Sequence, residues 1–202
     1  ERLVWAQAHW LQFEPQQAWD VLAALPLDEQ RSVAFLELRS ELAQALELDK
    51  EQIATLELLV ALKQRLTKDQ SEQLLQLYLQ TDPRKALELA VQGWRQGKSL
   101  NRLVMALQLA RQLGQWALLD SLLQEAHPVA AQLQGEPVYW QVLIASAAHR
   151  SDTARLDRLL AQLLEQFPDQ SWAIELYLWS QIDRQHSAGL AALLQEWRPL
   201  AQ

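Results

Sequence analysis

The chain has no cysteine and only five glycines among its 202 residues. The lack of cysteine excludes disulfides, thiolate nucleophiles and cysteine-ligated zinc sites. Five glycines are too few to build a glycine-rich loop that cradles phosphate groups. Cytosolic proteins commonly carry a stray thiol, so the complete absence of cysteine favours the bacterial periplasm, and we expect the chain to be located there.

Positive charge is scarce, and no apolar run is long. The net charge is −7, with 18 lysines and arginines against 25 acidic residues. Because no run of basic residues is present to neutralise a row of phosphates, we expect no nucleic-acid partner. No apolar stretch approaches the ~18 residues that a membrane-spanning helix needs. We therefore expect no membrane span in this chain.

Catalytic and metal-binding motifs are also missing. The four histidines are dispersed along the chain, and none has a second histidine at metal-ligand spacing. The motifs H-E-x-x-H, G-x-S-x-G and G-x-x-x-x-G-K-[ST] do not occur. We therefore predict a non-enzymatic protein with no catalytic residue, no metal site and no cofactor. Among the histidines, His127 precedes Pro128 and is predicted to lie at an exposed helix end.

The residues that are abundant are helix formers. Leucine, alanine, glutamine and glutamate dominate a composition that is half hydrophobic, and all four residues favour helix over strand. The sequence therefore predicts an all-α protein with a sizeable core. Glu37 and Glu41 lie one helical turn apart and are assigned to a solvated face.

A helical hairpin at residues 100–128 shows how the chain is built. Apolar residues recur at helical spacing from Leu100 to Leu113 and again from Leu118 to Ala126. Gly114 fits the position just after a helix, where a residue without Cβ adopts the left-handed conformation easily. Pro128 is predicted to end the second helix. A hairpin this short cannot bury both apolar faces alone, so similar neighbours are expected.

The spacing of one motif predicts that the hairpin repeats. Glu14-Pro15-x-x-Ala18 and Asp82-Pro83-x-x-Ala86 are the same acid-Pro-x-x-Ala pattern, displaced by 68 residues, which is twice a period of ~34. Helix ends marked by acidic residues, glycine and proline then divide the whole chain, as a single domain of 1–202, into six hairpins. The predicted hairpins cover roughly 1–26, 28–66, 68–97, 99–128, 137–168 and 170–200, with a third helix that begins at Asp28 and a last one from Ser187 to about Arg198.

The repeat resembles the tetratricopeptide repeat (TPR). Trp140-x-x-Leu143 matches the opening of its first helix, and Gly114-x-Trp116 matches its turn. The small residue that lets its helices approach closely is matched by Ala18, Ala86 and Ala188, whereas Leu119 and Leu156 depart from it. The resemblance implies a right-handed superhelical solenoid of about six hairpins that acts in protein–protein interaction. The chaperone-tail clamp of this family needs lysine and paired asparagines, and this chain has one asparagine, so that function is not expected.

The same resemblance implies which residues face the concave groove of the solenoid. This surface would be polar, rich in glutamine and nearly uncharged, with aromatic residues interspersed. The predicted groove residues are Gln7, Trp10, Ser71, Leu75, Tyr78, Val104, Gln108, Arg111, Gln141, Ala145, His149, Tyr177 and Gln181. Four other tryptophans, Trp5, Trp140, Trp172 and Trp179, are predicted to be wedges between packed helices. For His149 a plain surface position is the alternative.

A narrower resemblance lies near the end of the chain. The pattern there is Trp172-Ala173-(x)4-Leu178-Trp179-x-x-Ile182-Asp183, then Leu190-x-x-Leu193-Leu194-x-x-Trp197. It is similar to repeats in the periplasmic part of outer-membrane proteins that export biofilm exopolysaccharide, particularly the Pel type. The resemblance implies a scaffold that docks a periplasmic polysaccharide-modifying enzyme, such as a deacetylase or hydrolase, and that contacts the polymer.

Two other functions remain open from the sequence. The chain also fits a helical accessory domain of a cell-wall enzyme, such as a lytic transglycosylase, or a cytosolic regulatory sensor built from TPRs. Because it begins inside an apparent helix and ends soon after Pro199, we expect a fragment of a longer protein. Repeats at the ends of a solenoid expose apolar surface that a neighbour would cover, so weak self-association is expected.

Overall fold

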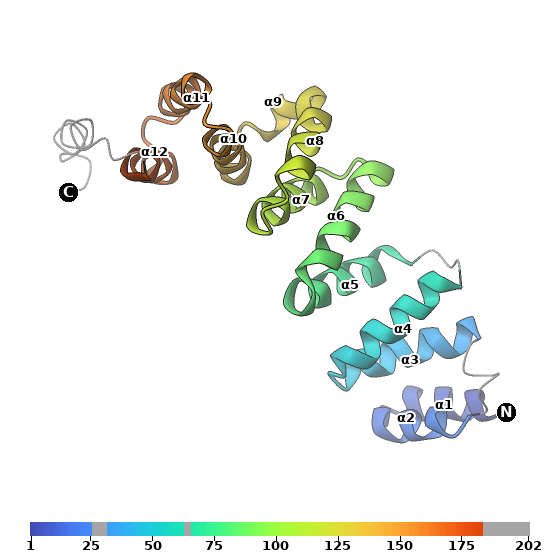
Figure 1. Cartoon of the computed structure of the whole chain (residues 1–202). Coiled ribbons are helices and arrows are strands. Elements are labelled where there is room, and N and C mark those ends of the chain that lie inside the picture. Colours follow the sequence, from blue (N-terminus) through green and yellow to red (C-terminus); the bar gives the residue numbers. More distant parts are fainter. Residues whose placement is uncertain (26–31, 63–65, 184–202) are drawn as a thin grey trace. The chain divides into compact units, whose positions relative to one another are not determined.

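The computed structural model describes residues 1–25, 32–62 and 66–183, and every regular element of these residues is a helix (Figure 1). This confirms the all-α prediction. Several predicted features lie outside the described residues: the helix start at Asp28, the last helix from Ser187, the small residue Ala188, and the apolar positions Leu190, Leu193, Leu194 and Trp197.

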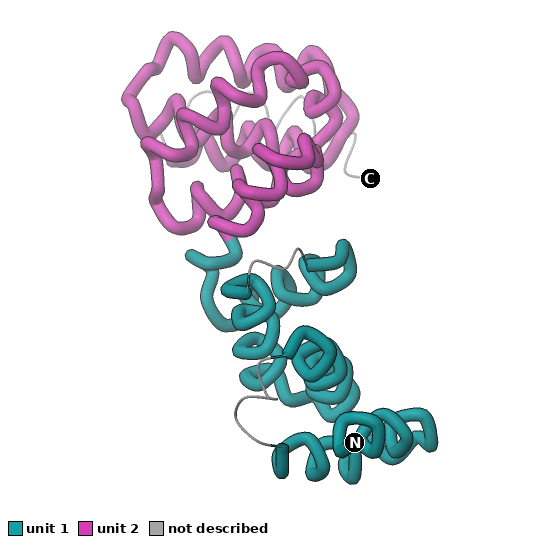
Figure 2. The backbone as a smooth tube through the Cα atoms, turned by 90° about the vertical axis from the view of Figure 1, so that its right-hand side faces the viewer, with its two compact units in different colours: residues 1–86 teal, residues 87–202 magenta. Residues whose placement is uncertain are grey.

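The chain divides into two compact units, Glu1–Ala86 and Leu87–Gln202 (Figure 2). The helices of unit 1 are α1 (Arg2–Leu11), α2 (Pro15–Ala23), α3 (Val33–Ala45), α4 (Asp49–Ala61) and α5 (Lys68–Thr81). Within this unit α1 packs on α2 and α3 packs on α4, as the predicted hairpins require.

Polar side chains cap the starts of two helices of unit 1. The Ser32 side chain accepts a hydrogen bond from the Phe35 backbone N–H at the start of α3, and Thr67 and Gln70 form a reciprocal capping box at the start of α5. Pro15 occupies the first turn of α2, as predicted.

Unit 2 continues the series of hairpins. Its helices are α6 (Pro83–Gly97, which begins in unit 1), α7 (Leu100–Gln112), α8 (Trp116–Ala126), α10 (Pro137–His149), α11 (Thr153–Gln166) and α12 (Ser171–Asp183). A 3₁₀ turn, η2 (His127–Val129), and the short α9 (Ala130–Leu133) connect α8 to α10. Pro128 ends α8 but not the helical path, because proline fits the first turn of the 3₁₀ segment. The prediction that Pro128 closes the second helix agrees with the end of α8 at Ala126, two residues earlier, whereas the short helical turns that follow were not predicted.

Four hairpins turn through one backbone device. Phe13, Glu47, Gly114 and Ser151 each follow the first helix of a pair and have φ between 55° and 65°. The Gly114 N–H donates a hydrogen bond to the Arg111 carbonyl at 3.1 Å. The N–H of the next residue, Gln115, donates to the Ala110 carbonyl at 2.8 Å. This is the Schellman pattern of helix ends, and the same pair of bonds recurs at the other three residues.

The core is leucine-rich with alanine where helices approach closely. Ala18 and Ala86 are fully buried, and the leucines that replace a small residue, Leu119 and Leu156, are buried as well. In unit 2, Trp140 is buried in a cluster with Leu160 and Leu163, and Trp172 packs against this cluster from α12. The predicted wedge role is therefore confirmed for Trp140 and Trp172.

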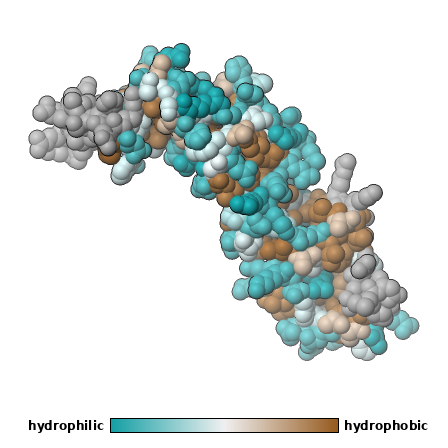
Figure 3. Space-filling model, in the orientation of Figure 1, coloured by the Kyte–Doolittle hydropathy of each residue, from teal (hydrophilic) through white to brown (hydrophobic). Residues whose placement is uncertain are grey.

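Two of the predicted tryptophan wedges are wrong. Trp5 and Trp179 are 67% and 64% exposed, because no described element packs over their side of α1 or α12. Among the described residues, Leu11 and Phe13 are also strongly exposed. On the face drawn in Figure 3, apolar residues accordingly lie scattered among hydrophilic ones.

The left-handed turns give a stability prediction. A left-handed residue with a Cβ costs roughly 1 kcal/mol more than glycine in this conformation, and the Phe13 side chain is 92% exposed. We expect Phe13→Gly to raise the free energy of unfolding by about 0.5–1 kcal/mol. The control Gln17→Gly lies on the exposed face inside α2 and should lower it by a similar amount. Urea denaturation measures both, and a loss of stability in Phe13→Gly would contradict the turn assignment.

Candidate functional site

The structure brings six of the predicted groove residues together in unit 2, where α7 packs against α10. We call this surface the α7–α10 face. It consists of Val104, Gln108 and Arg111 on α7, Gln141, Ala145 and His149 on α10, and the adjoining Trp116 at the start of α8. His149 is exposed, and the other six side chains are half-buried.

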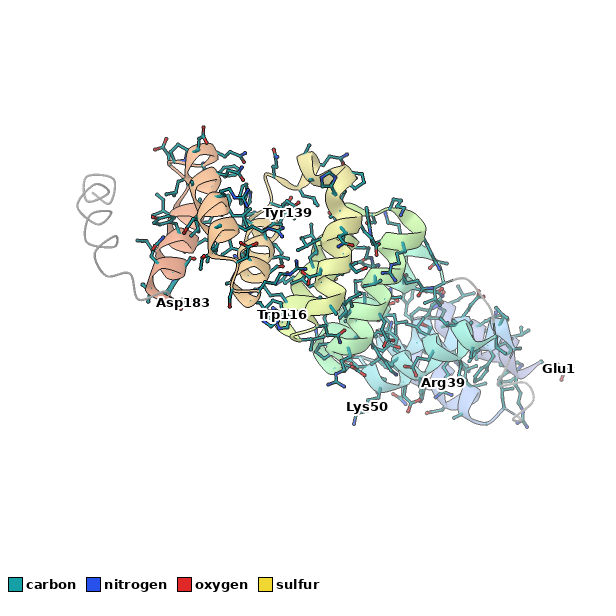
Figure 4. All side chains as sticks on the ribbon, turned by 45° about the horizontal axis from the view of Figure 1, so that its top comes forward. Glu1, Arg39, Lys50, Trp116, Tyr139 and Asp183 are labelled. Atoms are coloured by element: carbon teal, nitrogen blue, oxygen red, sulfur yellow. The ribbon has the colours of Figure 1, made fainter. Side chains whose placement is uncertain are left out.

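Trp116 and His149 form a stacked ring pair at one end of the α7–α10 face. Their ring centroids are 4.1 Å apart and their planes differ by 10°. The left-handed turn at Gly114 places Trp116 at the first position of α8, and His149 ends α10. Figure 4 labels Trp116. The stack therefore holds the end of one hairpin against the next and offers a flat aromatic surface to a partner.

Arg111 is the cation of the α7–α10 face. Its Nε atom is fully covered, and none of the described residues accepts a hydrogen bond from it. A buried donor without an acceptor is unfavourable by about 1–3 kcal/mol. A partner's acceptor would remove this cost if the half-buried Arg111 side chain turned outward on binding. Arg111 is therefore one indication of binding on this face.

The two predicted residues of α12 lie differently. Tyr177 is half-buried and packs against the Trp140 cluster, and Gln181 is 9% exposed because α12 packs on α11 and α10. These side chains contribute mainly to the packing of unit 2, and the prediction that Gln181 lies on an open surface is wrong.

Unit 1 also differs in part from the predicted groove. Gln7 is exposed and Trp10 and Ser71 are half-buried, whereas Leu75 is fully buried and Tyr78 is 7% exposed. The Tyr78 hydroxyl donates a hydrogen bond to Glu57 of α4 at 2.7 Å. Leu75 and Tyr78 are thus covered by neighbouring helices, and the expectation that they face an open groove is wrong.

Helix α3 carries three groove candidates that the sequence analysis missed. Glu37, Glu41 and Gln44 stand ten, six and three residues before the left-handed Glu47, as Val104, Gln108 and Arg111 stand before Gly114. All three are exposed, as the solvated assignment of the two glutamates required. Only the 34-residue distance between the left-handed residues Phe13 and Glu47 indicates these three candidates. The turn after α3 has a glutamate, Glu47, where the later turn has the more recognisable Gly114.

A second candidate site, which we call the α8–α11 hollow, opens among α8, α10, η2 and the start of α11. It has a volume of about 510 Å³. Its lining residues are Asp120, Leu123, Gln124, His127, Pro128, Tyr139, Leu143, Ser146, Arg150 and Arg155. Figure 4 labels Tyr139, near the start of α10. His127 is exposed, as predicted, but none of the predicted groove residues lies here.

The charged groups of the hollow are partly paired. Asp120 forms an ion pair with Arg150 and accepts a hydrogen bond from the Ser146 hydroxyl at 2.9 Å. Burial opposes ionisation of Asp120, but the hydrogen bonds from Arg150 and Ser146 outweigh it and lower the pKa of the carboxyl group. Burial raises the pKa of Tyr139. Asp120 is therefore a fixed anion, and Tyr139 stays a protonated donor at neutral pH.

Two further carboxylates are held ionised by contacts between helices. Hydrogen bonds from Lys85 and Tyr78 lower the pKa of Glu57. A hydrogen bond from Arg95 lowers the pKa of Glu125, with the Arg95 Nη2 and Glu125 Oε1 atoms 2.7 Å apart. Within unit 1 these contacts join α4 to α5 through Tyr78 and to the first turn of α6 through Lys85. Within unit 2 they join α6 to α8.

A pH prediction follows from these lowered pKa values. Each carboxyl group has a lower pKa in the folded state than in the unfolded state, so its contribution to stability is present above the unfolded value and is lost as the pH falls. We expect the free energy of unfolding to decrease as the pH falls from about 5 to about 3. Glu125→Gln should reduce the stability at pH 7 and weaken this dependence. The control Glu88→Gln changes an exposed glutamate of α6 and should do neither. Urea denaturation across this pH range measures both, and identical curves for the two variants would contradict the prediction.

Residues 1–25, 32–62 and 66–183 offer neither a metal-binding cluster nor a membrane span. This part of the chain holds no group of three or more histidine, aspartate or glutamate side chains placed to bind a metal ion. Within the same ranges, no helix is both long and apolar enough to cross a bilayer.

The comparisons with known proteins give one match. A family model described as "Tetratricopeptide repeat" matches residues 1–202. No curated protein and no solved structure matches the chain.

Proposed function

Because the chain belongs to the tetratricopeptide-repeat family, whose members generally use their repeats to bind proteins, we propose that it is a non-catalytic scaffold that holds a partner protein on the α7–α10 face. The observation that carries this proposal is Arg111, whose buried Nε atom has no acceptor among the described residues. A carbonyl or carboxylate of a bound segment would supply that acceptor once the half-buried side chain turns outward.

The character of the α7–α10 face fits an extended protein segment. Gln108 and Gln141 offer both donors and acceptors to a peptide backbone, and the Trp116–His149 stack offers a rigid aromatic anchor. Aromatic and arginine side chains carry much of the binding energy in protein interfaces. With Arg111 as its one cation, the face does not suit a strongly anionic ligand such as a nucleic acid.

The cellular setting is a finer part of the proposal. The tryptophan pattern of residues 172–197, which is similar to that of Pel-type export proteins, and the absence of cysteine support a place in the periplasm, within an exopolysaccharide export apparatus. The partner is then a periplasmic polysaccharide-modifying enzyme, a deacetylase or a hydrolase, and polymer is a second candidate ligand.

Calorimetric titration tests the proposed function. The purified chain is titrated with the purified periplasmic deacetylase or hydrolase of the source organism. We expect Arg111→Ala with His149→Ala to weaken binding by about 30-fold, since losing two anchors costs about 2 kcal/mol or more. The control Gln162→Ala with Gln166→Ala changes two exposed residues of α11 and should bind as the unchanged chain does.

Two outcomes would count against the proposal. If the Arg111 and His149 double variant is folded by circular dichroism and keeps full affinity, the partner does not bind the α7–α10 face. If the chain binds purified polymer but neither enzyme, it is a conduit and not a scaffold.

A further inference from the structure

The α8–α11 hollow lies on a different face of α10 from the α7–α10 face. Residues of a helix share a face when they recur every three to four positions. Gln141, Ala145 and His149 form one such series, whereas Tyr139, Leu143, Ser146 and Arg150 form another. A ligand in the hollow would therefore not compete with a partner on the α7–α10 face.

Hydrogen-bond donors exceed acceptors in the hollow. Asp120 is already engaged by Arg150 and Ser146. Across the described ranges, no carboxylate forms an ion pair with Arg155, and no group accepts a hydrogen bond from the Tyr139 hydroxyl. The guanidinium of Arg155 alone presents five N–H donors. A ligand that supplies acceptors would satisfy both side chains.

The charge of the hollow is opposite in sign to that of the chain. One carboxylate, Asp120, stands against two guanidinium groups, Arg150 and Arg155, while the whole chain has a net charge of −7. Arg155 lies in the first turn of α11, whose start is capped by Asp152. The hollow therefore attracts an anion in an otherwise acidic protein.

The volume and the apolar lining residues of the hollow indicate which kind of anion it can bind. Its volume of about 510 Å³ is in the range of pockets that enclose organic ligands and exceeds what a single inorganic ion fills. Leu123, Pro128 and Leu143 also line it. An apolar peptide side chain can bury its surface against these three residues. A hydrated ion or a sugar ring with hydroxyls on every side has little apolar surface to bury there.

We propose that the α8–α11 hollow binds an acidic segment of an extended peptide, with one carboxylate against Arg155 and Tyr139 and a neighbouring apolar side chain against Leu123 and Leu143. The scaffold thus has a second protein-binding site, independent of the α7–α10 face, that selects for negative charge.

Nuclear magnetic resonance tests this proposal with a defined probe. The ¹⁵N-labelled chain is titrated with the blocked peptide acetyl-Glu-Leu-Glu-Leu-Glu-amide and with its counterpart in which every glutamate is glutamine. We expect the acidic peptide to shift the Arg155 Nε–H signal and the backbone signals of residues 120–128 and of the hollow-lining residues of α10, which are Tyr139, Leu143, Ser146 and Arg150. The glutamine peptide and the Arg155→Gln variant should each bind at least about tenfold more weakly.

Controls separate this site from general charge attraction and from the proposed function. Arg158→Gln removes the same charge from an exposed position of α11 and should leave peptide binding unchanged, and Arg155→Gln should leave partner binding on the α7–α10 face unchanged. Shifts outside the hollow, equal binding of the glutamine peptide, or full affinity in Arg155→Gln would overturn the proposal. Tighter binding of an oligogalacturonate than of the acidic peptide would assign the hollow to polysaccharide and would also overturn it.

Discussion

Replacing Ala18 by tryptophan should lower the free energy of unfolding by roughly 3 kcal/mol or more. Ala18 is fully buried in α2, which packs on α1, so its methyl group is enclosed by neighbouring atoms. An indole ring has no space there, so the two helices must separate and the core of the first hairpin must open. Thermal denaturation followed by far-ultraviolet circular dichroism measures the loss.

The neighbouring residue provides the control for this experiment. Gln17 lies on the exposed side of α2, so Gln17→Trp adds the same ring to the same helix without displacing a neighbour, and it should be nearly silent. Ala86→Trp, at the matching position of the repeat, should behave like Ala18→Trp because Ala86 is fully buried too. Equal losses for Ala18→Trp and Gln17→Trp would show that the small residue does not set the helix approach.

Truncating Trp140 should have the second large effect, a loss of about 3–5 kcal/mol. The ring is 4% exposed, packs within a cluster formed by α10, α11 and α12, and makes an edge-on contact with Phe167 at a centroid distance of 6.2 Å. Its Nε1 atom donates a hydrogen bond to the Gln134 carbonyl at 2.8 Å. Trp140→Ala therefore leaves both a cavity and a lost hydrogen bond.

Trp179→Ala is the matched control for Trp140→Ala. It removes the same side chain from a position that is 64% exposed, so it should change the free energy of unfolding by less than about 1 kcal/mol. Urea denaturation of both variants gives the comparison. A loss in Trp179→Ala as large as that in Trp140→Ala would mean that residue 179 is a wedge after all.

These two tryptophans show what the sequence can and cannot predict. Helix existence follows from local patterns, so the hairpin at Gly114 and the proline-led helix at Pro15 were predictable. Which side of a helix is covered depends on neighbours that are distant in the sequence, and tryptophan at helical spacing looks the same in both cases. For this reason Trp140 was assigned correctly and Trp179 was not.

The turns show the same limit at the level of the backbone. Gly114 predicts a residue in the left-handed conformation, because glycine adopts that conformation without strain. Phe13, Glu47 and Ser151 adopt the same conformation, held by the Schellman hydrogen bonds, but their side chains give no sign of it. For this reason the position of α3 within the repeat was not assigned, and the groove candidates Glu37, Glu41 and Gln44 were missed.

The candidate sites were only partly predictable. Six residues of the α7–α10 face were indicated by the resemblance to the tetratricopeptide repeat, and four of them lie ten or six residues before a left-handed turn in both repeats. Trp116 was not among the predicted residues. The α8–α11 hollow requires α8, α10 and α11 to come together with Asp120 bound to Arg150, and no local pattern encodes that combination. Leu75, Tyr78 and Gln181 failed as groove residues because packing between helices buries them.

Hydrogen–deuterium exchange on the complex of the chain with its partner tests the central claim, that a protein partner lies on the α7–α10 face. The account predicts that binding slows exchange in residues 104–116 and 141–149 and leaves residues 153–166 unchanged. Protection confined to residues 153–166, with no change in residues 104–116 and 141–149, would contradict it.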